Sequence, residues 1–102
     1  MLNSSVVKIG DISVGGESPL VFILGPCQIE NRDHALFMAE KIVKVCEPSS
    51  SKFIFKSSFD KANRSSITSS RGIGIEEGLK ILEEVKSTFR CPVITDVHTV
   101  PQ

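Results

Sequence analysis

The segment from Lys56 to Ser66, KSSFDKANRSS, brings together residue types that bind anions. It contains two lysines, one arginine and four serines, and it directly follows the apolar run Phe53–Phe55. Lysine supplies a point charge and arginine a bidentate fork for phosphate, while hydroxyls and backbone N–H groups can complete an anion-binding cradle. From Lys52 to Arg71 five basic residues accompany one acidic residue, so the positive charge is local. The segment predicts a site for phosphorylated small molecules; the alternative is a serine-rich loop whose charges only interact with water.

Three further side chains of chemical interest follow other apolar runs. Cys27 comes directly after Gly25-Pro26. As a thiolate it could bind a transition metal, and the alternative is a small buried packing residue. Asp96 and His98 alternate along a segment expected to be extended, so their side chains should point the same way. They could bind a sugar hydroxyl or move a proton, whereas the plainer alternative for Asp96 is a cap on the following loop.

The elements that must position these residues alternate between strands and helices. Two short β-rich runs, Val6–Ile9 and Ile12–Val14, flank Gly10-Asp11 and predict a hairpin. Three apolar runs predict buried strands, the first buried on both faces: Leu20–Leu24, Lys52–Ser57 and Cys91–Val97. Two amphipathic segments predict helices, one capped by Asn31 and ended by Pro48, the other running from Glu76 to Phe89.

This order of elements predicts an α/β fold with a parallel sheet and right-handed crossovers. Polar clusters then follow each strand, at the carboxyl ends where parallel α/β folds build their sites. Gly72 and Gly74 do not belong to a dinucleotide-binding motif, because Glu77 replaces its third glycine. They should instead form a tight turn into the second helix. Three strands leave unpaired edges and the sequence stops soon after the third, so we expect a single partial domain. Residues 1–16 would form the hairpin and residues 20–102 the strands and helices.

The composition argues against several classes of partner. Twelve basic residues balance twelve acidic ones and the chain lacks Trp and Tyr, so we expect neither nucleic acid nor an anionic membrane as a partner. No apolar stretch is longer than Leu20–Leu24, which is far too short to span a bilayer, and the N-terminus lacks a signal-peptide pattern. We therefore expect a cytoplasmic protein. Three cysteines without close spacing predict neither a disulfide framework nor a zinc knuckle.

Four stretches together carry a resemblance to a known family. In order, GPCQIE, KSSFDKANRSS, SSRGIGIEEGLKIL and ITDVH closely resemble the 3-deoxy-D-manno-octulosonate 8-phosphate synthases. The resemblance runs from about Val7 to the end of the chain, and the segment around Lys61 and Arg64 is its most specific part. The sibling synthases of the aromatic pathway share a GPC-type first strand but carry a KPRT-type segment at the second, which this chain lacks.

The resemblance implies a TIM (β/α)8 barrel, usually tetrameric. A complete barrel needs about 250 residues, so this chain would hold the N-terminal hairpin and the first three βα-type units. Such enzymes condense phosphoenolpyruvate with D-arabinose 5-phosphate and water, giving 3-deoxy-D-manno-octulosonate 8-phosphate and phosphate for lipopolysaccharide biosynthesis in Gram-negative bacteria. The alternatives are an inactive truncated fragment, a non-catalytic sugar-phosphate-binding module, or another phosphoenolpyruvate-dependent 3-deoxy-aldulosonate synthase.

The resemblance also implies roles for individual residues. Three would contact phosphoenolpyruvate: Lys56, Ser58 and Lys61. Four would hold the arabinose 5-phosphate: Asn63, Arg64, Ser65 and Asp96. Of these residues, Lys61 and Asp96 would take part in catalysis, and the role of His98 stays open.

Cysteine at the position of Cys27 is the mark of the metal-dependent class, whereas members with asparagine there work without metal. The resemblance therefore implies a divalent transition metal (Zn, Fe, Mn or Co) in the complete enzyme. Its remaining ligands, and the Arg and Lys groups that complete the phosphoenolpyruvate site, would lie beyond Gln102. Three residues depart from the family pattern without removing a charge from the proposed cradle: Thr68, Ile73 and Thr99.

Overall fold

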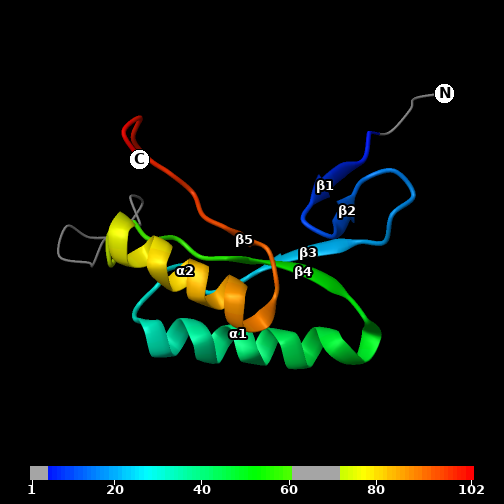
Figure 1. The fold of residues 1–102 in the computed structure, drawn as a ribbon, viewed down its shortest axis with the longest axis horizontal. Helices are drawn as coiled ribbons and strands as arrows, with labels where there is room; N and C mark the ends of the chain where they lie inside the picture. Colours follow the sequence, from blue (N-terminus) through cyan, green and yellow to red (C-terminus); the bar gives the residue numbers. More distant parts are fainter. Residues whose placement is uncertain (1–4, 61–71) are drawn as a thin grey trace.

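The computed structural model describes residues 5–60 and 72–102, which form a hairpin followed by a three-stranded sheet with two helices (Figure 1). In chain order the elements are β1 (Val7–Ile9), β2 (Ile12–Val14), β3 (Val21–Leu24), α1 (Arg32–Cys46), the 3-10 turn η1 (Glu47–Ser49), β4 (Lys52–Lys56), α2 (Ile75–Phe89) and β5 (Val93–Ile94). Strands and helices follow one another as the sequence predicted, so the α/β class is confirmed.

The N-terminal hairpin is formed by β1 and β2, which pair antiparallel with Val7 opposite Val14 and Ile9 opposite Ile12. Gly10 has a φ of +59° in the turn between them, a left-handed conformation that glycine adopts without a steric penalty from Cβ. The predicted hairpin around Gly10-Asp11 is therefore confirmed.

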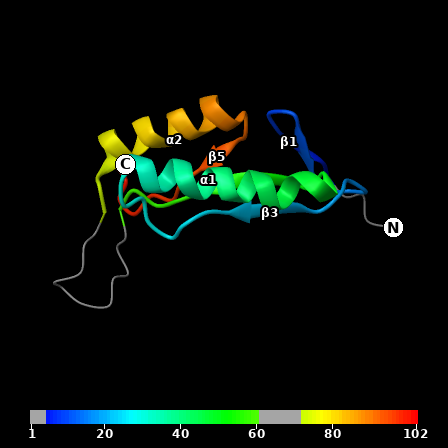
Figure 2. The ribbon, with the colours of Figure 1, turned by 90° about the horizontal axis from the view of Figure 1, so that it is seen from below.

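The main sheet is parallel, in the order β3-β4-β5, with β4 in the centre. Phe53 pairs with Phe22 on one side, and Phe55 pairs with Val93 on the other. Because paired residues of neighbouring parallel strands share a face, these aromatic side chains lie on one face of the sheet. Helices α1 and α2 both cover that face (Figures 1 and 2).

The core lies between the two helices and this face of the sheet. Its buried members are Ile29, Ala35, Ala39, Cys46, Phe53, Phe55, Phe59, Ile81, Leu82, Val85 and Cys91. Phe55 and Val85 are fully buried. Burying an aliphatic or aromatic side chain of this size contributes about 1.5–3 kcal/mol, so this layer is the main source of stability.

The first apolar run is less buried than predicted. The strand begins at Val21 rather than Leu20, and Leu20 is 74% exposed and Ile23 55% exposed. β3 pairs only with β4 among the described residues, and the helices cover only the face opposite Ile23. The prediction of a strand buried on both faces is therefore wrong for β3, because it lies at an edge of the sheet.

The last strand is shorter than predicted. Cys91–Val97 was expected to be extended throughout, yet β5 covers only Val93–Ile94. Its ladder with β4 ends where Lys56 pairs with Ile94, because β4 itself ends there. An apolar sequence cannot show where its partner strand stops.

The helix ends confirm the predicted signals. Asn31 caps α1, and its Oδ1 accepts a hydrogen bond of 2.8 Å from the backbone N–H of His34. α1 ends at Cys46, and Pro48 lies in the short turn η1. Gly74, with φ +95°, precedes α2 and its N–H donates to the Phe59 carbonyl oxygen at 3.1 Å, so the expected glycine turn is present.

Arg32, at the start of α1, forms a bidentate ion pair with Glu84 of α2. The guanidinium Nε donates to Oε1 at 2.7 Å, and Nη2 donates to Oε2. This hydrogen bonding lowers the pKa of Glu84 and raises the pKa of Arg32. The pair joins the two helices to each other.

Within residues 5–60 and 72–102, neither helix is long and apolar enough to cross a membrane.

Candidate functional site

The polar segments that follow β3, β4 and β5 meet at the carboxyl ends of the strands. The hydroxyl of Ser57 donates to the Pro26 carbonyl at 2.7 Å. The backbone N–H of Ser58 donates to the Cys27 carbonyl at 3.2 Å, and the carbonyl of Ser58 in turn accepts from the N–H of Ile29 at 2.9 Å. Parallel pairing therefore continues beyond the regular strands, and it brings the described candidate residues to one place as the sequence predicted.

Close approach of β3 to β4 requires glycine at position 25. A Cβ added at Gly25 would lie 1.8 Å from the carbonyl oxygen of Lys56, far inside contact distance. The backbone of Lys56 cannot move away, because Ser57 and Ser58 are bonded on both sides to Pro26, Cys27 and Ile94. Gly25 thus sets the spacing between the segments that carry Cys27 and Lys56.

Asp96 is the centre of a chain of side chains. Ser58 Oγ donates to Asp96 Oδ1 at 2.5 Å, and the other carboxylate oxygen, Oδ2, lies 3.3 Å from His98 Nε2. The prediction that Asp96 and His98 point the same way is confirmed. The hydrogen bond from Ser58 lowers the pKa of Asp96, and the charges of Lys56 and His98 lower it further. The carboxylate is therefore ionised at neutral pH and partly exposed.

Cys27 is exposed, so its interpretation as a buried packing residue is wrong; Cys46 and Cys91 are the buried thiols. Burial raises the pKa of the Cys91 thiol. Among the described residues no three His, Cys, Asp or Glu side chains gather closely enough to hold a metal ion. Cys27 is thus accessible to a ligand, but the described part of the chain supplies no set of partners for it.

Four of the predicted site residues lie outside the described residues: Lys61, Asn63, Arg64 and Ser65. The described residues on either side of them are held together. Phe59 is 1% exposed in the core, its carbonyl oxygen accepts the N–H of Gly74, and a Cβ added at Gly72 would lie 2.4 Å from that oxygen. Residues 60 and 72 therefore lie close together in space. Residue 60 is also only two positions after Ser58, which bonds to Asp96.

The comparisons with known proteins bear on this arrangement. The sequence profile of the DAHP synthetase I family matches residues 3–102. The chain belongs to the DAHP synthetase I family. It is 59% identical over 97 residues to a protein of Rickettsia felis and 60% identical over 97 residues to one of Rickettsia prowazekii, each named 2-dehydro-3-deoxyphosphooctonate aldolase.

Each alignment covers 95% of this chain but 35% of the relative, so the chain spans about a third of the length of these DAHP synthetase I relatives. The family resemblance inferred from the motifs is confirmed, and the relatives are named as enzymes. The convergence of strand ends described above therefore belongs to a segment that matches part of a larger enzyme in this family.

Two residues of this DAHP synthetase I segment were not anticipated from the sequence. Phe59 falls within the polar segment from Lys56 to Ser66, although it is buried and packs against Gly78 of α2. A lone aromatic between serines and charges, together with an unexplained glycine inside a helix, was the available signal. The second residue, Gln102, bonds across the chain to Asp60 and carried no local signal.

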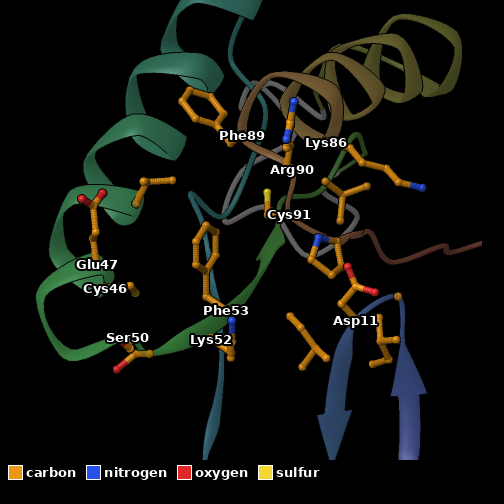
Figure 3. Close-up of a pocket in the computed structure, with 17 residues that line it drawn as sticks. Asp11, Cys46, Glu47, Ser50, Lys52, Phe53, Lys86, Phe89, Arg90 and Cys91 are labelled. Atoms are coloured by element: carbon orange, nitrogen blue, oxygen red, sulfur yellow. The ribbon is translucent and has the colours of Figure 1, made fainter.

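A cavity of about 800 Å3 lies at the amino-terminal ends of β4 and β5, opposite the candidate site (Figure 3). Its walls come from the β1–β2 turn, the ends of both helices and the beginning of β4. Its lining carries charged residues of both signs, for example Asp11 and Arg90. None of the predicted site residues lines it, and the strand ends at Asp96 remain the candidate site.

Proposed function

We propose that this chain is part of a 3-deoxy-D-manno-octulosonate 8-phosphate synthase. Such an enzyme condenses phosphoenolpyruvate with D-arabinose 5-phosphate and water and releases inorganic phosphate. The observation that carries the proposal is the hydrogen bond from Ser58 to Asp96. It joins a residue expected to contact phosphoenolpyruvate to a residue expected to contact the sugar. The relatives named 2-dehydro-3-deoxyphosphooctonate aldolase support the same reaction at 59% and 60% identity.

We propose further that the three-stranded sheet is one sector of a TIM barrel. Its strands are parallel and adjacent in chain order, and both helices lie on one face. On the other face Ile23 and Ile94 are exposed, and a closed barrel would cover them. The matched segment is 35% of the length of its relatives, close to three strands of eight. The tetrameric assembly implied by the resemblance, and the cytoplasmic location expected from the sequence, belong to the same proposal.

In the proposed reaction, carbon 3 of phosphoenolpyruvate attacks the sugar aldehyde while water adds at carbon 2. The resulting hemiketal phosphate then loses inorganic phosphate. Two phosphates and a carboxylate repel each other unless cations offset their charge, which is the role proposed for Lys56, Lys61 and Arg64. Holding the reactants together in this way lowers a barrier by about 7–11 kcal/mol in favourable intramolecular cases.

Asp96 supports this reaction as an acceptor. Because Ser58 and Lys56 favour its charged form, Asp96 stays ionised at neutral pH and can accept a hydrogen bond from a sugar hydroxyl near the aldehyde. His98 lies 3.3 Å from the same carboxylate and can donate or accept a proton there. The hydrogen bond from Ser58 to one carboxylate oxygen fixes the orientation in which Asp96 would bind the sugar.

Cys27 is proposed as one ligand of a divalent transition metal in the complete protein. Its exposure and its place at the end of β3 suit a thiolate ligand, and the family described by the resemblance divides at this position. The described residues gather no further set of ligands, so the partners would come from other parts of the protein. When bound, the metal would orient or polarise the water or the aldehyde oxygen.

The proposed function can be tested in the complete protein by measuring phosphate release from phosphoenolpyruvate in the presence of different sugar phosphates. We expect turnover with arabinose 5-phosphate and much less with erythrose 4-phosphate, whose product is one carbon shorter. Arg64→Ala should raise the KM for arabinose 5-phosphate more than that for phosphoenolpyruvate, and Lys61→Ala should do the reverse. Equal effects of both changes on both substrates would overturn the division of roles.

Other outcomes of the same assay decide between the alternatives. Faster turnover with erythrose 4-phosphate would assign the protein to the sibling synthases of the aromatic pathway. Binding of both substrates without phosphate release would indicate a non-catalytic module. Binding that ignores the sugar and falls steeply with salt would indicate a polyanion site.

A further inference from the structure

The side chain of Gln102 folds back onto the loop that follows β5. The backbone turns between Thr99 and Gln102, where the Gln102 N–H donates to the Thr99 carbonyl at 3.2 Å. Oε1 of the side chain then accepts the backbone N–H of His98 at 2.7 Å and that of Thr99 at 3.3 Å. One amide oxygen thereby satisfies two consecutive backbone donors directly after the strand end.

The nitrogen of the same amide reaches a distant part of the chain. Nε2 donates to Asp60 Oδ2 at 3.0 Å, across 42 positions of sequence. Asp60 follows Phe59, which the core holds in place. Only one orientation of the amide fits these contacts, because two backbone N–H groups need an acceptor and the Asp60 carboxylate needs a donor.

Two side-chain hydrogen bonds therefore join the loop after β4 to the loop after β5. Ser58 bonds to Asp96, and Asp60 bonds to Gln102. His98 lies between Asp96 and Gln102 in sequence. Its imidazole contacts the Asp96 carboxylate and its backbone N–H is held by Gln102, so the residue is fixed from both ends.

We propose that Gln102 is a positioning residue, whose side-chain amide holds the loop after β5 against Asp60 and fixes where His98 lies. Neither end of this bridge is a residue expected to contact a substrate. The bridge acts through the Asp96–His98 pair, so its effect on turnover rests on the proposed function, whereas its effect on the loop does not.

Three changes of near-constant size dissect the bridge in the complete protein. Gln102→Met removes the acceptor and the donor. Gln102→Glu keeps the acceptor for His98 but places a second carboxylate against Asp60. Combining Gln102→Glu with Asp60→Asn exchanges donor and acceptor, so the bridge can form again. Asp60→Asn alone completes the double-mutant cycle and accounts for any other contact of Asp60.

The first measurement is hydrogen exchange of the His98 and Thr99 backbone amides. Gln102→Met should speed their exchange, while amides in the middle of α1 should keep their wild-type rates as an internal control. Exchange at His98 and Thr99 that is the same in wild type and Gln102→Met would overturn the bridge itself. This measurement needs no turnover, so it tests the bridge even if the proposed function fails.

The second measurement is kcat/KM with its pH profile. Losing one net hydrogen bond corresponds to roughly a two- to tenfold fall, which we expect for Gln102→Met and Gln102→Glu, with the double variant recovering most of it. The acid limb of the profile should shift in the single variants, because His98 moves relative to Asp96. Faster exchange with unchanged kcat/KM and pH profile would make the bridge structural only and overturn the positioning role. An inactive wild type would instead contradict the proposed function.

Discussion

Phe59 lies directly against Gly78 of α2, so closely that a Cβ added at Gly78 would come within 2.4 Å of the Phe59 Cβ. Glycine inside a helix costs about 1 kcal/mol relative to alanine, yet here it makes room for a buried ring. The ring in turn fixes the chain between Ser58 and Asp60. Gly78 therefore lowers the helix propensity of α2, but it allows Phe59 to pack and hold a loop of the candidate site in place.

Gly78→Ala should lower stability although it improves helix propensity. Overpacking a core contact typically costs about 1–3 kcal/mol, against a gain of about 1 kcal/mol, and the cost should be high here because the added Cβ would meet the Phe59 Cβ, which no side-chain rotation can move away. Denaturant unfolding measures the difference. Thr88→Ala, at a position of the same helix away from Phe59, is the matched control and should be neutral or slightly stabilising. A Gly78→Ala protein more stable than wild type would show that Phe59 moves freely.

Gly25→Ala should be the most damaging glycine change in the described residues. The added Cβ would lie 1.8 Å from a backbone oxygen that cannot move, so we expect a loss of about 3 kcal/mol or more, or failure to fold. Gly10→Ala is the control: its φ is left-handed but no atom lies within 4 Å, so the cost should be only about 1–2 kcal/mol. Similar unfolding midpoints for the two variants would contradict the close approach of β3 and β4.

Ser58→Ala should raise the pKa of Asp96 toward its ordinary value, because it removes the largest cause of the lowering. In wild type, a carboxylate with a depressed pKa stabilises the fold above its ordinary pKa of 3.8, and this contribution is lost as the pH falls through the lowered value. The variant should therefore be less stable at neutral pH and lose less stability on acidification. Carboxyl carbon shifts of Asp96 and unfolding at acidic and neutral pH measure both effects.

Ser57→Ala is the matched control for this change. Its hydroxyl bonds to the Pro26 carbonyl rather than to Asp96, so stability should fall by about 1–3 kcal/mol with the pKa of Asp96 unaltered. An equal pKa for Asp96 in wild type and Ser58→Ala would contradict the hydrogen bond between Ser58 and Asp96.

Cys27→Ala should abolish the metal-dependent activity proposed for the complete protein. Chelation should remove activity and a divalent transition metal should restore it in wild type, while the variant should behave like the chelated protein in both metal content and turnover. Cys27→Asn should recover metal-free activity, because asparagine occupies this position in the metal-independent members that the resemblance describes. Cys91→Ala controls for loss of a thiol, since Cys91 is buried. Full activity after exhaustive chelation, with no metal by elemental analysis, would return Cys27 to a role without a metal.

Local signals in the sequence predicted most elements correctly. The turn at Gly10-Asp11 and the Asn31 cap depend on contacts within a few residues, so their types and spacing suffice. The meeting of Cys27, Ser58 and Asp96 also followed from the sequence, because parallel strands place their carboxyl ends on one edge. These are consequences of chain geometry that any similar alternation of strands and helices would share.

Features that depend on a distant partner were predicted poorly. β5 ends at Ile94 because β4 ends at Lys56, and nothing near Ile94 encodes that limit. The exposure of Ile23 reflects the lack of a second neighbour for β3 in the described part of the chain. The bond from Gln102 to Asp60 spans 42 positions, and a glutamine in the loop after β5 gives no hint of it.

The hydrogen bond between the Phe59 carbonyl and the Gly74 N–H has a consequence for how the family can diversify. It joins the described residues on either side of residues 61–71, so both ends of that interval are held by the strands and helices. New substrate preferences can then arise by substitution at the proposed substrate residues, such as Lys61 and Arg64, while Phe59, Gly74 and Gly78 hold the two ends of the interval in place. The junction therefore separates the residues proposed to bind substrate from the residues that hold the fold together.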